Sequence, residues 1–200
     1  MMKIMKMLGL MLICLPLITL AQEMPGMQIG VLAPDFEAEN YKAETVKLSD
    51  LYKKGPVVLV FYRGGWCPYC NMHLQELQAH MEDFKRYNAA VVAVSVDKIQ
   101  KAVETVDGKR LDFEVISNPQ GDILEKYGLV YKVPEELNKK YKEKYNIDLE
   151  ASSGRTDGMI AIPATYIIDE SGTIVFAYAN EDYKVRTKAE EILEALDQMK

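Results

Sequence analysis

Two continuous apolar runs dominate the pattern of hydrophobic and polar positions along the chain. Residues 57–62 (VVLVFY) and 91–96 (VVAVSV) are rich in β-branched and aromatic side chains and contain almost no polar position. Strands that are buried on both faces of a sheet have this pattern, whereas half-buried strands alternate. Shorter segments predict further strands at residues 35–39, 45–48, 113–116, 165–168 and 173–178.

Helical spacing of apolar positions follows the first of these runs. Leu74, Leu77, Met81 and Phe84 lie three or four residues apart, which predicts one helix from residue 68 to about residue 88. Ser49 is the predicted N-cap of a short helix at residues 50–53. Further helices are expected at residues 99–106, 121–127 and 187–199, and a loop at residues 152–158.

The segment 134–150 is rich in lysine and glutamate, yet Leu137, Tyr141 and Tyr145 are four residues apart. This spacing predicts an amphipathic helix inserted on the surface, with its charges facing water. Strands that alternate with helices and end in a hairpin around the turn 169–172, followed by a closing helix, predict one α/β domain with a mixed central sheet.

The first 21 residues have the pattern of a signal peptide. Lys3 and Lys6 precede the apolar run 7–20, and residues 19–21 offer small side chains at the positions that a signal peptidase reads. We therefore expect a cleaved segment at 1–21, a mature domain at 22–200, and export to the periplasm or the medium. The run is short for a membrane span, which favours cleavage, and an uncleaved membrane anchor is the alternative. In either case membrane contact is expected only through this segment.

Composition narrows the possible functions. The 200 residues are 48% hydrophobic and 27% charged, which is typical of a soluble domain with a proper core. The net charge of −6 argues against nucleic acid as a partner. Cleavage would remove Cys14, and the two remaining cysteines, Cys67 and Cys70, lie within four residues of each other. Such a pair indicates local redox or metal chemistry rather than a disulfide framework.

The position of Cys67 favours redox chemistry. It stands where a buried strand ends and a helix opens, and Pro68 suits the first helical position. The unpaired amides and the positive end of the helix dipole lower the pKa of such a thiol from about 8.5 towards neutrality or below. Arg63 adds positive charge if it points inward. Cys70 lies one turn further on the apolar face, so we expect Cys67 to attack and Cys70 to resolve.

Other interpretations of the pair are weaker. Zinc needs about four ligands, and His73 and His80 on the same helix cannot easily complete that set. Covalent haem needs a histidine where Asn71 stands, and a structural disulfide would close only a tiny loop. No metal and no cofactor are therefore expected, and both histidines are interpreted as surface or boundary residues. Trp66 is expected to form a wall beside the nucleophile or to serve as simple packing.

Pro163 is a second signal, far from the cysteines in sequence. It precedes the β-branched strand 165–168, and because proline lacks a backbone donor it must stand at a strand start or in a special turn. A cis bond between Ile162 and Pro163, lying against the cysteine pair, is the arrangement expected here, although cis is the minority state of such bonds.

The segment 60–71 (VFYRGGWCPYCN) resembles the active-site segment of the peroxiredoxin-like branch of the alkyl hydroperoxide reductase/thiol-specific antioxidant family. Residues 33–36 (APDF), 163–169 (PATYIID) and 182–186 (DYKVR) extend the resemblance over essentially the whole mature chain. The resemblance implies a thioredoxin-like fold with an N-terminal extension, and it implies that Pro163 is the cis-proline beside the active-site cysteines.

The chain departs from the family's peroxidase pattern at two positions. Gly64 stands where such enzymes carry threonine or serine, three residues before the peroxidatic cysteine. Pro163 stands just before the strand where they usually carry arginine. Arg63 and Arg186 are the candidates to replace the missing cation.

These observations lead to ranked hypotheses of function. The first is an antioxidant enzyme that reduces hydroperoxides through Cys67, with Cys70 resolving and an external thiol or thioredoxin-type protein donating electrons. Arg63, Trp66, Pro163 and Arg186 are the expected substrate-binding residues. The alternative is thiol–disulfide exchange on protein disulfides with the same cysteines. A binding module without turnover ranks last.

Overall fold

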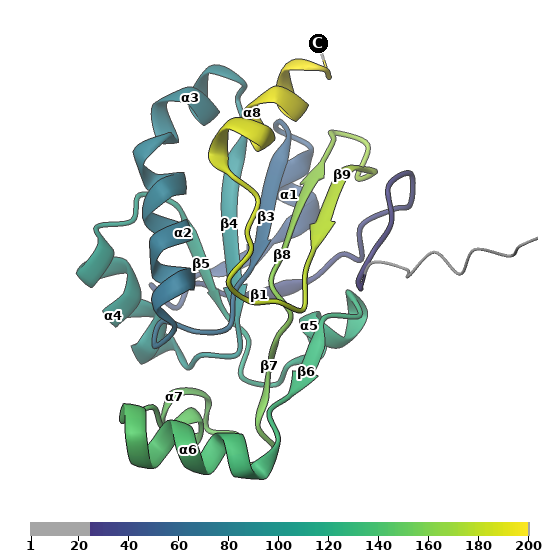
Figure 1. The fold of residues 1–200 in the computed structure, drawn as a ribbon. Helices are drawn as coiled ribbons and strands as arrows, with labels where there is room; N and C mark the ends of the chain where they lie inside the picture. The colour runs from purple at the N-terminus through teal and green to yellow at the C-terminus, as the bar shows by residue number, and fades with distance from the viewer. Residues whose placement is uncertain (1–24, 200) are drawn as a thin grey trace, which may run out of the picture.

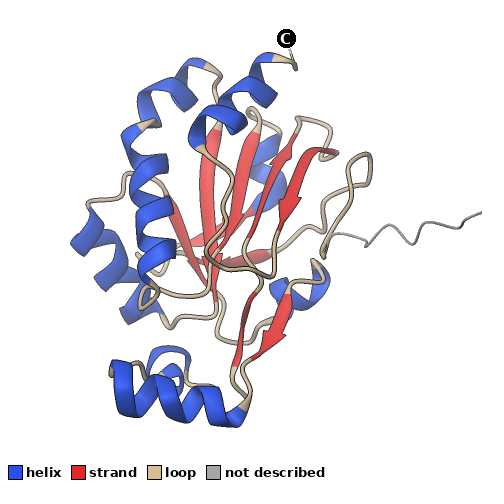
Figure 2. Ribbon diagram, viewed as in Figure 1, coloured by secondary structure: helices blue, strands red, loops and turns tan. Residues whose placement is uncertain are grey.

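A five-stranded mixed sheet forms the centre of the molecule. The computed structural model describes residues 25–199, and its sheet has the order β5-β4-β3-β8-β9 (Figures 1 and 2). The strands are β3 (Val57–Phe61), β4 (Ala90–Ser95), β5 (Glu114–Ser117), β8 (Ala164–Ile168) and β9 (Ile174–Ala179). The strands β3, β4 and β5 are parallel, and β8 and β9 are antiparallel to their neighbours.

The middle strand β3 explains why residues 57–62 read as continuously apolar. Val57 pairs with Ala90 of β4 on one side and with Ile168 of β8 on the other. Val58 and Val60 face one core cluster, whereas Leu59 and its neighbours on alternate positions face the other. All five side chains of β3 are buried, as the pattern predicts for a strand covered on both faces.

Helices cover both faces of the sheet. On the face of Val58 and Val60 lie α2 (Pro68–Ala79), α3 (Met81–Arg86), α4 (Ile99–Lys109) and α8 (Ala189–Asp197). On the opposite face lie α1 (Leu48–Tyr52) and α5 (Asp122–Lys126). This layering confirms the predicted α/β fold of the thioredoxin-like class.

The N-terminal extension forms a small hairpin of β1 (Glu37–Glu39) and β2 (Thr45–Lys47), followed directly by α1. The prediction that Ser49 caps this helix is wrong, because α1 begins at Leu48. The backbone N–H of Ser49 is satisfied instead by Asp35, whose Oδ1 accepts it at 2.9 Å.

The single helix predicted from residue 68 to 88 is divided in two. His80 lies between α2 and α3 with φ −103° and ψ 12°, outside helical geometry. Its Nδ1 lies 3.2 Å from Asp83 Oδ2, in the first turn of α3. Apolar spacing continues through this break because both helices bury the same side, so periodicity could not reveal it.

The predicted surface insertion is real but more elaborate than one helix. Two short strands, β6 (Val130–Lys132) and β7 (Met159–Ala161), pair with each other and flank α6 (Glu135–Tyr145) and α7 (Leu149–Ser153). The prediction of one helix over 134–150 is wrong because Asn146 adopts φ +55° and ends α6. The predicted loop 152–158 is wrong at its start, where Ser153 is still helical. Figure 1 shows this green insertion beyond one end of the sheet.

Pro163 stands immediately before β8, at a strand start as predicted, but its peptide bond is not cis. Residues 25–199 contain no cis peptide bond, so the expected cis Ile162–Pro163 bond is wrong. Trans is the ordinary state of such bonds, and here it is compatible with a hydrogen-bonded segment. Ile162 N donates to Leu129 O at 2.7 Å, and Pro163 O accepts from Asn180 N at 3.1 Å.

The predicted signal segment 1–21 lies outside the described residues. Within residues 25–199, no helix is both long and apolar enough to cross a membrane.

The different burial of two leucines predicts that their alanine variants lose very different amounts of stability. Leu59→Ala removes a fully buried side chain from β3 and should lower the free energy of unfolding by about 2–5 kcal/mol. Leu32→Ala removes a side chain that is 70% exposed and should change it by less than about 0.5 kcal/mol. Urea unfolding under reducing conditions measures both, and equal losses would contradict the placement of β3 at the centre.

Candidate functional site

The turn between β3 and α2 places Cys67 at a helix N-terminus. Cys67 is the N-cap of α2 with φ −88° and ψ 116°, and Pro68 occupies the first turn, as predicted. Its backbone N–H donates to Gly64 O at 3.0 Å, and its own carbonyl accepts from Asn71 N at 3.0 Å. The side chain is fully buried. The sulfur therefore faces the partial positive charge of the helix N-terminus.

The two thiols differ strongly in acidity. A hydrogen bond from the Cys70 thiol, together with the positive charges of Arg63 and Arg186, outweighs burial and lowers the pKa of Cys67 to about 6. Burial raises the pKa of Cys70 well above its ordinary value, and the neighbouring Cys67 thiolate raises it further. At neutral pH the pair thus carries one negative charge, on Cys67. An attacking Cys67 and a resolving Cys70 would need this difference in acidity.

Arg63 points inward, beside the nucleophile. Its Nη1 lies 3.9 Å from Cys67 Sγ, and only 5% of the residue is exposed. The other terminal nitrogen, Nη2, donates to the hydroxyl of Tyr141 at 2.8 Å. The guanidinium carbon lies 4.0 Å from the ring centroid of Tyr183 and 5.0 Å from that of Trp66. Aromatic faces attract such a cation, most strongly where water is excluded.

Arg186 approaches the second cysteine from the segment before α8. Its Nη2 lies 3.6 Å from Cys70 Sγ, and its Nη1 donates to Val185 O at 2.8 Å. Neither Arg63 nor Arg186 forms an ion pair with a carboxylate among residues 25–199. The two arginines of the sequence prediction therefore flank the cysteine pair from two different parts of the chain.

The other two predicted site residues lie one layer further out. Trp66 is half-buried and forms a wall beside Arg63. Pro163 lines a cavity of about 210 Å³ together with Arg63, Tyr141, Tyr183 and Glu181. Arg63, whose Nη1 lies 3.9 Å from Cys67 Sγ, is therefore one of the side chains that border this cavity.

Gly64, the departure from the peroxidase pattern, has a structural explanation. Its φ is +145°, a conformation that residues with side chains rarely adopt. A Cβ at this position would collide with Trp66 Nε1 and come within 2.9 Å of Asp97 Oδ1. The threonine or serine of the usual pattern therefore does not fit this backbone, and the site has no hydroxyl at this position.

Asp97 is a functional candidate that the sequence reasoning missed. The residue is 1% exposed, and its Oδ2 accepts the backbone N–H of Gly65 at 2.7 Å, which fixes the loop before Cys67. Burial raises the pKa of Asp97 to about 6. The available signal was a carboxylate placed directly after the buried run 91–96, at the end of a strand.

Tyr141 and Tyr183 were also missed as site residues. The sequence pattern puts Tyr141 on an amphipathic surface helix, and Tyr183 enters only through the segment 182–186 that carries the resemblance. The apolar stripe of 134–150 did signal a buried face, but not that this face packs against Arg63.

His73 corrects a further expectation. It was interpreted as a surface or boundary residue, but it is 3% exposed on the inner face of α2. Burial and the charge of Arg186 lower the pKa of His73 to about 4, so its ring is neutral at physiological pH. His80 is partly exposed beside Asp83 and matches the interpretation.

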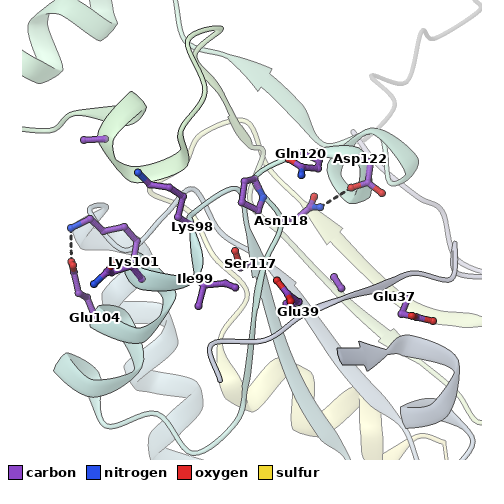
Figure 3. A pocket seen from close by; sticks show the side chains of 14 residues that line it. Glu37, Glu39, Lys98, Ile99, Lys101, Glu104, Ser117, Asn118, Gln120 and Asp122 are labelled. Atoms are coloured by element: carbon purple, nitrogen blue, oxygen red, sulfur yellow. Dashed lines mark hydrogen bonds and ion pairs between the residues drawn. The ribbon is translucent and has the colours of Figure 1, made fainter. Parts of the chain in front are cut away.

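No group of three or more histidine, cysteine or acidic side chains in the described part of the chain could hold a metal ion. A wider cavity of about 750 Å³ lies near the start of α4, away from the cysteines (Figure 3). Within its lining Lys101 pairs with Glu104, and Asn118 donates a hydrogen bond to Asp122. We assign the chemistry to the cysteine pair and not to this cavity.

Comparison with known sequences places the site in a family. Residues 29–177 match the model of the AhpC/TSA family. Peroxiredoxin Bcp of Bacillus subtilis is 28% identical over 173 residues, which cover 86% of this chain and 95% of that protein.

Solved structures agree on the fold. Peroxidoxin BcpB from Mycobacterium tuberculosis superposes with a TM-score of 0.69 at 20% identity, covering 87% of this chain and 99% of that one. AhpC of Enterococcus faecalis gives a TM-score of 0.65 at 20% identity, covering 86% and 91%. At this identity the likeness concerns the fold alone, and the family follows from the sequence match over three quarters of the chain. The chain belongs to the AhpC/TSA family.

Proposed function

We propose that this chain is a thiol-dependent peroxidase in which Cys67 reduces a hydroperoxide and Cys70 resolves the product. The observation that carries the proposal is the contact between Arg63 Nη1 and Cys67 Sγ, in a buried site that contains no competing carboxylate contact to that arginine among residues 25–199. A thiolate is the reactive form of cysteine, and this contact favours it. The match to a relative named a peroxiredoxin supports the same reaction class.

In the first step, the Cys67 thiolate attacks the terminal oxygen of the hydroperoxide. A sulfur–oxygen bond forms, the oxygen–oxygen bond breaks, and the leaving alkoxide takes a proton from solvent to become an alcohol, or water when hydrogen peroxide reacts. The sulfur is oxidised to a sulfenic acid. Arg63 stabilises the charge that moves from sulfur to the leaving oxygen, because its cation is already buried at the reacting atom.

In the second step, Cys70 condenses with the sulfenic acid to form a disulfide, and water leaves. The first step makes Cys70 easier to deprotonate, because oxidation of Cys67 removes the negative charge that raises the pKa of Cys70. The charge of Arg186, whose Nη2 is 3.6 Å from Cys70 Sγ, then favours the Cys70 thiolate. Cys67 is the N-cap of α2 and Cys70 lies in its first turn, with the two thiols in hydrogen-bonding contact, so the disulfide needs little rearrangement of the chain.

An external dithiol would complete the cycle by returning two electrons and two protons to the disulfide. A thioredoxin-type protein is the donor we propose. Export to the periplasm or the medium, after cleavage of residues 1–21, is part of the same proposal. It rests on the sequence pattern of Lys3, Lys6 and the apolar run that follows.

Thiol–disulfide exchange on protein disulfides remains the second candidate. Gly64 favours it, because the usual hydroxyl of a peroxidase site is missing at that position. A cis-proline beside the cysteines was the second argument for disulfide exchange, and it is lost because the Ile162–Pro163 bond is trans.

Cys67→Ser should abolish rapid peroxide consumption, because the hydroxyl of serine is not ionised near neutral pH and cannot replace the thiolate. Stopped-flow assays with hydrogen peroxide, an organic hydroperoxide and an oxidised protein measure the three reactions side by side. The proposal expects fast, saturable hydroperoxide reduction by the reduced wild type. Fast exchange with the protein disulfide but slow reaction with both peroxides would favour the second candidate.

Cys70→Ser should still react once with hydroperoxide, but it should not turn over with a dithiol-protein donor, because no intramolecular disulfide can form. One equivalent of sulfenic acid should accumulate on Cys67, and mass spectrometry after trapping with dimedone detects it. Unchanged steady-state turnover in Cys70→Ser would contradict the resolving role.

A further inference from the structure

The insertion between β6 and β7 reaches the active site through one side chain. Tyr141 is the buried residue of α6, whereas the rest of that helix is largely charged and solvent-exposed. Tyr145, one turn further on, is 58% exposed. The buried side chain of α6 is thus the one whose hydroxyl binds Arg63, which connects this surface helix to the site.

Tyr141 binds the Nη2 side of the Arg63 guanidinium. Its hydroxyl accepts the hydrogen bond from Arg63 Nη2 at 2.8 Å, while Nη1 of the same group lies 3.9 Å from Cys67 Sγ. The guanidinium is planar and rigid, so fixing Nη2 also fixes Nη1. The ring of Tyr141 packs against Trp66, with centroids 5.9 Å apart, which holds the hydroxyl in place.

We propose that Tyr141 is a positioning residue, which holds Arg63 against the sulfur of Cys67 so that the inserted helix α6 completes the active site. The proposal rests on the proposed function in one respect, namely that Cys67 is the nucleophile. It adds that the acidity and reactivity of Cys67 depend on a residue that belongs to the insertion rather than to the sheet and helices of the core.

The structure also offers Arg63 an alternative position. Glu181 lines the same 210 Å³ cavity as Arg63 and Tyr141, and it is exposed. Without the hydroxyl of Tyr141, Nη2 would be a buried donor with no partner, which is unfavourable. Arg63 would then turn through the cavity towards Glu181 and solvent, and away from the thiolate.

The charged and titratable groups around Arg63 and its cavity come from four parts of the chain. Cys67 and Cys70 lie at the start of α2, Tyr141 lies on α6, and Tyr131 lines the cavity from β6. The segment before α8 contributes Glu181, Tyr183 and Arg186. Arg186 keeps its place beside Cys70 when Arg63 moves, so part of the acidity of Cys67 should survive the loss of Tyr141.

The test is the pH dependence of Cys67 reactivity in Tyr141→Phe, which removes the hydroxyl and keeps the ring. Iodoacetamide alkylation of the reduced protein should show a midpoint about one pH unit above that of the wild type. Because alkylation follows the thiolate fraction, the rate at pH 5 should fall about tenfold, while the rates at pH 9 should agree. The thermal midpoint and the circular dichroism spectrum should change little.

Tyr145→Phe is the matched control on the same helix, and it should leave the profile unchanged. A double-mutant cycle isolates the route of action. In the background Arg63→Met, the change Tyr141→Phe should no longer move the midpoint, because Tyr141 acts through Arg63.

The proposal is overturned if Tyr141→Phe keeps the wild-type midpoint, or if it shifts the midpoint equally with and without Arg63. Its failure is distinguishable from failure of the proposed function. A shifted alkylation midpoint in a protein that reduces no hydroperoxide would support the positioning role and refute the peroxidase.

Discussion

The site depends on one buried cation, the guanidinium of Arg63. It is almost fully removed from water, and among the described residues it contacts no carboxylate; the opposite charge that it meets is the thiolate of Cys67. A buried charge is costly unless it is paired and hydrogen-bonded. The hydroxyl of Tyr141 and the ring of Tyr183 supply part of that compensation, and the thiolate supplies the rest. Arg63 and Cys67 therefore stabilise each other's ionised form, and this pairing keeps Cys67 as a thiolate, which is the reactive form.

The fold brings these groups together from distant parts of the sequence. The central strand β3 ends just before Arg63, and the turn that follows leads directly into α2, which starts beside Cys67. The insertion lies beyond the same end of the sheet (Figure 1). It carries Tyr141, and the segment before α8 carries Tyr183 and Arg186. Asp97 holds the turn in place by accepting a hydrogen bond from the backbone N–H of Gly65. Arg63 is thus the side chain that contacts both the insertion, at Tyr141, and the sulfur of Cys67.

The sequence was sufficient for the parts of this arrangement that follow from local chemistry. The strand 57–62 and the helix start at Pro68 needed only the hydrophobic pattern and the preference of proline for a first helical turn. The greater burial of Cys70, which raises its pKa, followed from its place on the apolar face of the helix. Contacts between segments far apart in the chain could not be predicted in the same way from the sequence. The stripe containing Tyr141 showed that one face of a helix is buried, but periodicity does not name the partner of that face. The cis bond expected before Pro163 rests on its place before a strand as well as on the family resemblance, and the structure shows the ordinary trans state instead. His73 was misplaced because a polar side chain on the edge of an apolar stripe can lie on either side of the boundary.

The pairing of Arg63 with the Cys67 thiolate can be measured without any substrate. The absorbance of the reduced protein at 240 nm reports thiolate, and the account predicts one thiolate appearing with a midpoint near pH 6, well before the second cysteine ionises. Replacing the cation, in Arg63→Met, should move that midpoint upward, because the thiolate loses its opposite charge while remaining buried. A wild-type midpoint at the ordinary cysteine value of about 8.5, or one that Arg63→Met does not change, would contradict the account.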